Sequence, residues 1–166
     1  MAHVINLRTV FRQTGPMACW FYAAKTVIFH KTGRTLMEAD YLGSGPLPSA
    51  PVETGRGAGV PTWLAFGLPP GRVAQFAELF HFAQPSHPAT WTASDLESTL
   101  RQHGPLWFGG HSGRFNHVVV MCGIDRRGVH YGDPATGQVA TASLEAFNSW
   151  TRQQIDVPNP LYYSGR

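Results

Sequence analysis

Charged side chains are scarce in this sequence, and they are not gathered into runs. Asp, Glu, Lys and Arg make up 14% of its 166 residues, whereas an average soluble domain has roughly 25%. The formal net charge is +3, and the arginines are scattered along the chain. Because a nucleic-acid or membrane-surface interface needs basic residues clustered on one face, we expect neither nucleic acid nor membrane as a partner.

Cysteines and long apolar stretches are also few. The two cysteines, Cys19 and Cys122, argue against a small secreted domain held together by disulfides. No apolar run of 18 residues occurs, and the first residues lack the basic and apolar regions of a Sec signal. The spacings Cys-x-x-Cys and His-Glu-x-x-His do not occur, so we expect no metal site and no cofactor.

The sequence has enough apolar residues for one real core. Its hydrophobic content is 43% and its length is near that of one domain, which predicts a single domain over residues 1–166. With 18 glycines and 13 prolines, much of the chain should be loop. Such residues concentrate between Gly43 and Gly71, where only a short helix at Val60–Phe66 is expected.

Helical patterns dominate the first two thirds of the chain. Apolar residues recur every three or four positions over Ala18–His30, directly after a Gly15-Pro16 turn, which predicts a helix with Cys19 in its first turn. A second helix is expected at Arg72–Phe82. A third should run from Ser94 to about His103, with Ser94 and Glu97 as a capping box.

Strand patterns follow the helices. Short β-branched or aromatic runs occupy Pro105–Phe108, His117–Ile124 and Gly128–Tyr131, and a turn joins the last two. We expect an antiparallel sheet, then a closing helix at Ser143–Trp150 and an irregular tail. Helices followed by a sheet predict an α+β domain.

One residue is available for each role in acyl transfer by a thiol. That chemistry needs a nucleophile, a base, a group that orients the base and donors for the oxyanion. Cys19 at a helix start is the candidate nucleophile and His117 at a strand start the candidate base. Asp133 follows the next strand and can hold the imidazole by its far nitrogen. Gln13, six residues before the cysteine, can point its amide at the oxyanion.

Three segments resemble a known family. Gln13-Thr-Gly-Pro-Met-Ala-Cys19-Trp20 resembles the Gln…Cys-Trp segment of papain-like cysteine peptidases. The run from residue 116 to 125 is similar to their His-Ala-Val-x-x-x-Gly-Tyr strand, and the run from 131 to 137 resembles the aspartate-proline turn of bacteriocin-leader peptidases. The compact length and the Met-Ala-Cys-Trp context also resemble effector proteases that bacteria inject into plant or rival bacterial cells.

This resemblance implies a papain-like fold, with an N-terminal helix carrying Cys19 packed on a C-terminal antiparallel sheet that carries His117 and Asp133. The family often has Asn where this chain has Asp133, and a carboxylate can orient the base equally well. A long prosegment and multiple disulfides are missing, so the resemblance is to minimal bacterial versions. Five residues are candidates for bordering the substrate groove: Trp20, Gly109, Gly110, His111 and Asn116.

Other readings of the same residues stay open. His111 and His130 compete with His117 as the base, and Asp133 can instead cap the turn that follows it. Cys122, inside an apolar strand, reads as a buried and inert side chain. Trp20, Gly109 and Gly110 can simply be core residues.

The resemblance implies an endopeptidase that cleaves a protein substrate through a thioester on Cys19, cutting after small residues such as Gly-Gly. It also implies a bacterial toxin that stays in the cytoplasm of the producing cell until a signal-independent system delivers it into a target cell. A cognate immunity protein would then be a partner. The alternatives are a transglutaminase or glutamine deamidase with the same triad, and a non-catalytic binding module.

Overall fold

The computed structural model describes residues 2–37, 67–68, 70–86, 88–111, 116–151 and 159–165. The short helix expected at Val60–Phe66 lies outside these residues. The described helices are α1 (Cys19–Thr32), the 3-10 turn η1 (Pro70–Arg72), α4 (Val73–Leu79), α5 (Ala93–His103) and α6 (Leu144–Thr151).

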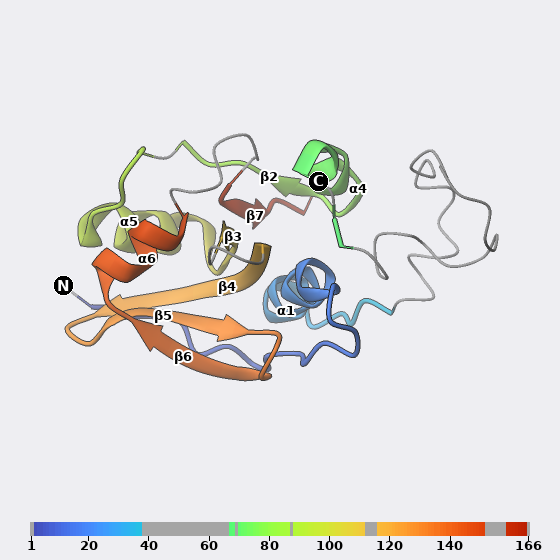
Figure 1. Ribbon diagram of the computed structural model, residues 1–166, viewed down its shortest axis with the longest axis horizontal. Helices are drawn as coiled ribbons and strands as arrows, with labels where there is room; N and C mark the ends of the chain where they lie inside the picture. Colours follow the sequence, from blue (N-terminus) through green and yellow to red (C-terminus); the bar gives the residue numbers. More distant parts are fainter. Residues whose placement is uncertain are drawn as a thin grey trace.

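One antiparallel sheet organises the described part of the chain. Its strands are β1 (His3–Val4), β2 (Phe82–Ala83), β3 (Leu106–His111), β4 (Asn116–Asp125), β5 (Gly128–Asp133), β6 (Gln138–Ala142) and β7 (Leu161–Tyr163). The strand order is β2-β7-β3-β4-β5-β6, and β1 pairs with β4. The predicted α+β class and the antiparallel arrangement are thus confirmed (Figure 1).

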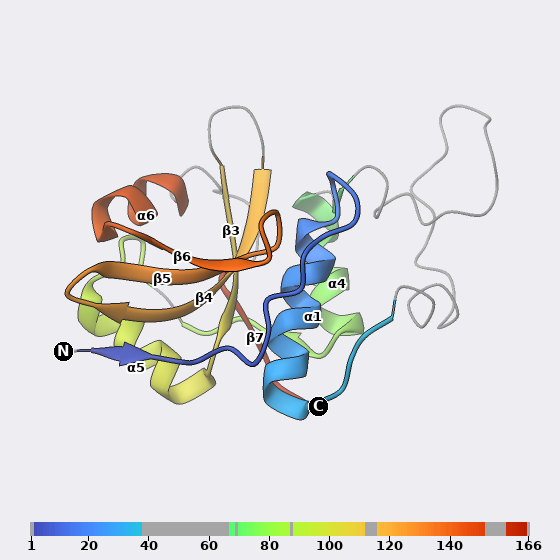
Figure 2. The ribbon, with the colours of Figure 1, turned by 90° about the horizontal axis from the view of Figure 1, so that it is seen from below.

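Helices cover both faces of the central strands. In Figure 2, α1 and α4 lie on one side of β3 and β4, and α5 and α6 lie on the other. Side chains alternate between the faces of a strand: Val118 and Val120 pack with the α1 cluster, whereas Val119 and Met121 pack with α5 and α6. The core therefore has two parts, with β4 between them.

The helix that carries the first cysteine is buried over most of its length. Its buried side chains include Trp20, Phe21, Ala24 and Val27, each 1% exposed or less. Burial on several sides explains why apolar residues alone, without a side-chain cap at Ala18, hold this helix in place. The helix predicted at Ala18–His30 is confirmed, with its end at Thr32.

The capping box of α5 was predicted at the wrong pair. The Thr92 hydroxyl accepts a hydrogen bond from the Asp95 amide at 3.1 Å, and the Asp95 carboxylate accepts one from the Thr92 amide at 3.1 Å. The helix starts at Ala93, so Ser94 already lies inside it. Glu97 instead pairs with Arg101 one turn later, at 2.7 Å.

Two predicted boundaries change because Phe82 and the C-terminal tail enter the sheet. The helix expected at Arg72–Phe82 ends at Leu79, since β2 starts at Phe82 and pairs with Tyr163. The tail, expected to be irregular, contains β7 between β2 and β3. Three residues are too few to show a period of their own, so pairing with two neighbours determines this strand.

Candidate active site

Cys19 is the first residue of α1, directly after a turn. Its amide belongs to the first helical turn, where backbone N–H groups have no partner within the helix, and where the helix dipole favours negative charge. The side chain is 8% exposed. The thiol is therefore nearly enclosed, at a position that suits an anion.

His117 and Asp133 meet at one end of the β4–β5 hairpin. The two strands pair antiparallel, with Val120 opposite Gly132, which brings the start of β4 beside the end of β5. His117 Nε2 and Asp133 Oδ1 are 2.7 Å apart. The expectation that a hairpin joins the two side chains is met.

Asp133 caps the turn that follows it and also contacts His117. The same Oδ1 that contacts His117 accepts a hydrogen bond from the Ala135 amide at 2.9 Å. Burial raises the pKa of Asp133, but the hydrogen bonds from His117 and Ala135 and the charge of His117 lower it more, and the pKa falls below its usual value. The turn thus holds an ionised carboxylate against the imidazole.

Cys19 acts on His117 as well, since it contributes to the raised pKa of the imidazole, and this places the start of α1 beside the hairpin. Because Nε2 faces Asp133, Nδ1 is the ring nitrogen left for the thiol. Burial lowers the pKa of His117, but the contacts with Asp133 and Cys19 and their negative charges outweigh it, raising the pKa to about 9. At neutral pH the imidazole is therefore protonated between two acidic groups.

Gln13 is held by the turn that precedes α1. Its Nε2 donates to the carbonyl oxygens of Gly15 at 2.9 Å and Pro16 at 3.2 Å. Its Oε1 is buried without a hydrogen-bond partner among the described residues. Since the amide hydrogens are engaged by the turn, an oxyanion role requires the amide to change partners, and that role stays a prediction.

The competing histidine His130 belongs to a different group of side chains. It is 5% exposed, and its Nε2 lies 2.8 Å from Asp125 Oδ1. The close contact with His130, more than its other contacts, lowers the pKa of Asp125 to about 2. Cys122 donates to the His130 carbonyl oxygen at 3.4 Å, and burial raises the pKa of its thiol to about 12. This second Cys, His and Asp set contains no reactive thiolate.

The other competitor, His111, lies at the end of the β3–β4 pair. Its Nδ1 is 2.9 Å from Oδ1 of Asn116, which is exposed. The chain between these two residues is outside the described part. Whether either residue contacts substrate stays a prediction.

The remaining groove candidates are enclosed. Trp20 is 1% exposed, and its carbonyl oxygen accepts a hydrogen bond from Trp107 Nε1. Gly109 exchanges two hydrogen bonds with the Asn159 side chain, at 2.9 and 2.7 Å. A Cβ on Gly110 would collide with the Trp150 ring. These contacts are with the protein, so a role in binding substrate stays a prediction for all three.

A cavity of about 220 Å³ lies beside His117 and Asp133, on the face covered by α6. Sequence reasoning missed it, although Phe147 and Trp150, three residues apart in the predicted closing helix, carried a signal for one shared face. Its walls are His117, Val119, Tyr131, Asp133, Ala142, Ala146, Phe147 and Trp150.

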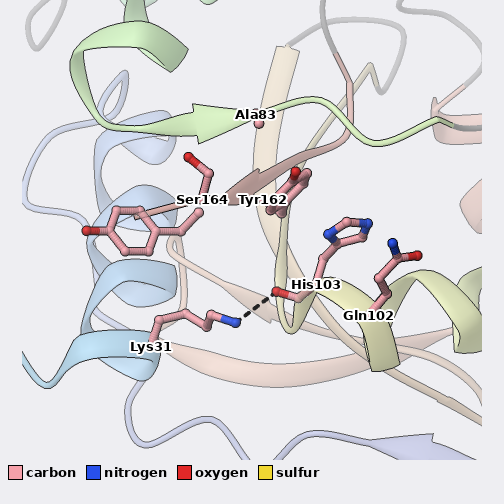
Figure 3. Close-up of a pocket in the computed structure, with 7 residues that line it drawn as sticks. Lys31, Ala83, Gln102, His103, Tyr162 and Ser164 are labelled. Carbon is pink, nitrogen blue, oxygen red and sulfur yellow. Dashed lines mark hydrogen bonds between the residues drawn. The ribbon is translucent and has the colours of Figure 1, made fainter. Parts of the chain in front are cut away.

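A second cavity, of about 390 Å³, contains none of the predicted site residues (Figure 3). It lies where α1 and α5 end, at the other end of α1 from the cysteine. Lys31 reaches across it and donates a hydrogen bond to the His103 carbonyl oxygen at 3.1 Å. A cation at a helix C-terminus is a stabilising arrangement. Because none of the candidate catalytic residues lines this cavity, it is separate from the candidate active site.

Among the described residues, no group of three or more His, Cys, Asp or Glu side chains is arranged to hold a metal ion. In the same part of the chain, no helix combines the length and apolar character needed to cross a membrane.

Comparison with known proteins gives one family. A family model described as papain-like cysteine protease AvrRpt2, a bacterial effector, matches residues 1–152. No curated protein matches the chain. The family match spans Gln13, Cys19, His117 and Asp133 alike.

Proposed function

We propose that this chain, which belongs to the family of papain-like cysteine protease AvrRpt2, is an endopeptidase that forms a thioester on Cys19. The observation that carries the proposal is the position of His117, which is hydrogen-bonded to Asp133 and close enough to Cys19 for that residue to raise the pKa of the imidazole. An imidazolium beside a cysteine favours the thiolate, which is the nucleophilic form.

In the proposed reaction, Cys19 Sγ attacks the carbonyl carbon of the scissile peptide bond, and the carbonyl oxygen becomes an oxyanion. His117 gives its proton to the peptide nitrogen, the C–N bond breaks, and the amine leaves. A water molecule then attacks the thioester, losing a proton to His117. The C–S bond breaks, which releases a carboxylic acid product and restores the thiolate beside the imidazolium.

Asp133 acts in this scheme by holding His117. The Asp133 carboxylate accepts a hydrogen bond from His117 Nε2 at 2.7 Å, so Nδ1 is kept toward the thiol. The charge of the carboxylate also stabilises the imidazolium. The Cys19 amide and the Gln13 side chain are the proposed oxyanion donors.

We further propose that the protein is a toxin delivered into a target cell, where it cuts after small residues such as Gly-Gly. Support comes from the effector that names the family and from the resemblance of the Met-Ala-Cys-Trp segment to injected effector proteases. A toxin that acts inside cells would require a cognate immunity protein in the producer, and we include that partner in the proposal.

Expression of the chain in a bacterial cytoplasm tests the function. We expect growth arrest and new protein termini with the wild type, and neither with Cys19→Ala. Cys122→Ala is the matched control, because it removes the buried thiol, and it should behave as the wild type does. New termini are read by terminus-labelling proteomics.

Other outcomes point to the alternatives. Toxicity that depends on Cys19 without new termini indicates a deamidase or a transglutaminase, and a mass increase of about one dalton at glutamine identifies deamidation. Equal behaviour of the wild type and Cys19→Ala would remove this residue from the mechanism and favour a binding module.

A further inference from the structure

The position of the cavity beside His117 indicates which part of a peptide substrate could enter it. It shares His117 and Asp133 with the candidate active site, but its walls include no residue of α1 and not Cys19. It therefore opens beside the general acid and away from the nucleophile. Substrate atoms that reach it must lie on the His117 side of the bond that is cut.

The position of the leaving amine determines which substrate residue lies near the cavity. To receive a proton, its nitrogen must come within about 3 Å of the imidazole. The Cβ atom of the same residue is two bonds further, so it lies within about 6 Å of His117. The side chain of the first residue after the cut bond is thus the one that reaches a cavity walled by this imidazole.

The walls select the chemistry of that side chain. Among the described residues, the walls other than His117, Asp133 and Tyr131 are aliphatic and aromatic side chains. The two charged walls lie 2.7 Å apart and neutralise each other, so the walls that the structure describes offer no free charge for an acidic or basic side chain. Burying a charged group without a partner is costly.

The aromatic walls are fixed in place before any substrate arrives. Phe147 contacts Phe108 with ring centroids 4.9 Å apart, and Trp150 contacts Phe147 at 5.9 Å. The indole also lies against Gly110, where a Cβ would collide with it. A pocket that needs no rearrangement loses little affinity to ordering.

The size of the cavity is that of one side chain. Its volume of about 220 Å³ is below the roughly 300–1,000 Å³ of pockets that hold whole small-molecule ligands. Resting on the proposed peptidase function, we propose that this cavity binds an uncharged apolar side chain, such as Leu, Met or Phe, of the first residue after the cut bond. Tyr131, Phe147 and Trp150 are then specificity-determining residues.

The test uses peptides prepared by digesting a cell lysate as a substrate library. After treatment with the purified protein, mass spectrometry reads the residues that flank each new terminus that Cys19→Ala does not produce. We expect Leu, Met, Ile and Phe to be enriched about tenfold or more over Asp, Glu and Lys at the first position after the cut.

A substitution that fills the cavity tests the assignment, and the same substitution elsewhere on α6 is its control. Ala146 lines the cavity from α6, and Ala146→Phe should abolish the apolar enrichment and favour Gly or Ala at that position. Ser149→Phe adds the same ring at an exposed position of the same helix that does not line the cavity, and it should keep the wild-type preference. If Ala146→Phe does not fold, Ala142→Leu fills the same space from β6.

The outcomes separate this inference from the function on which it rests. Cleavage that depends on Cys19, but with no apolar preference at that position or with one unchanged by Ala146→Phe, overturns the pocket and leaves the peptidase. No cleavage that depends on Cys19 in any peptide overturns both. Enrichment that is lost in Ala146→Phe and kept in Ser149→Phe supports the assignment.

Discussion

The backbone amide of Gln13 donates a hydrogen bond to the carbonyl oxygen of Pro134 at 2.8 Å. This bond ties the segment that leads into α1 to the turn that carries Asp133. The proposed nucleophile and the proposed base-orienting carboxylate come from residues far apart in the sequence, and their spacing depends on such cross-links. A Cβ on Gly137, in the same turn, would come within 3.0 Å of the Arg12 side chain, so the two segments are packed closely as well as hydrogen-bonded.

Replacing Asp133 by Asn keeps a side chain that can orient His117, so kcat/KM below pH 7 should fall by less than about tenfold. The change removes the negative charge that helps to hold the pKa of His117 at about 9. His117 must be protonated to give its proton to the leaving amine, so wild-type kcat/KM should fall as pH rises through about 9. In Asp133→Asn that alkaline limb should move to lower pH. A limb at an unchanged pH would show that Asp133 does not set the protonation of the base.

The same pKa shift makes stability depend on pH. The folded pKa of His117, about 9, lies above its value of 6.5 when unperturbed, so its contribution is fully present below pH 6.5 and is lost as pH rises toward 9. We expect a loss on the order of 2 kcal/mol, reduced from the full shift because 27% of the side chain is exposed. Urea unfolding at pH 6 and pH 9.5 measures it, and His117→Gln should flatten the difference.

The two cysteines should differ sharply toward a thiol reagent. Cys122 is 1% exposed and its pKa is raised to about 12, so it should not react in the folded protein. Iodoacetamide at pH 7 should therefore modify one cysteine per molecule in native buffer, at Cys19, and two in denaturant. Labelling of Cys122 in the native state would contradict the assignment of this residue to the core.

Gly110→Ala should destabilise the protein by about 1–3 kcal/mol, because the new Cβ collides with the Trp150 ring. Gly71→Ala is the control, since a Cβ there meets nothing within 4 Å. Thermal unfolding measures both effects, and tryptophan fluorescence reports whether the indole moves. Equal melting temperatures for the two variants would mean that Trp150 is free to shift.

The sequence predicted the elements that have a period of their own. The Ala18–His30 pattern, the β4–β5 hairpin and the helix ending at His103 are all present with small changes at their boundaries. Short strands such as β2 and β7 were not predicted, because two or three residues carry no periodicity and pair only when distant segments arrive. The same limit applies to the cavity, whose walls come from three strands and one helix.

Candidate site residues were easier to propose from the sequence than the side chains that surround them. Cys19, His117 and Asp133 carry chemistry that few other positions in this chain can provide, so residue type and order pointed to them. The Gln13 amide shows the limit of that reasoning, because spacing placed it near the nucleophile but did not predict its hydrogen bonds to Gly15 and Pro16.

Gln13→Ala distinguishes an oxyanion donor from a part of the turn. Peptide cleavage passes through an oxyanion, whereas alkylation of Cys19 by iodoacetamide does not. If the side chain stabilises the oxyanion, kcat should fall by roughly 100- to 1,000-fold with the alkylation rate changed by less than about threefold. If it only supports the Gly15-Pro16 turn, the loss of two hydrogen bonds displaces the nucleophile, and both rates should fall together with the melting temperature. Because the amide already binds the turn in the free protein, the kcat effect should also exceed the KM effect, since its change of partners is needed only when the oxyanion forms.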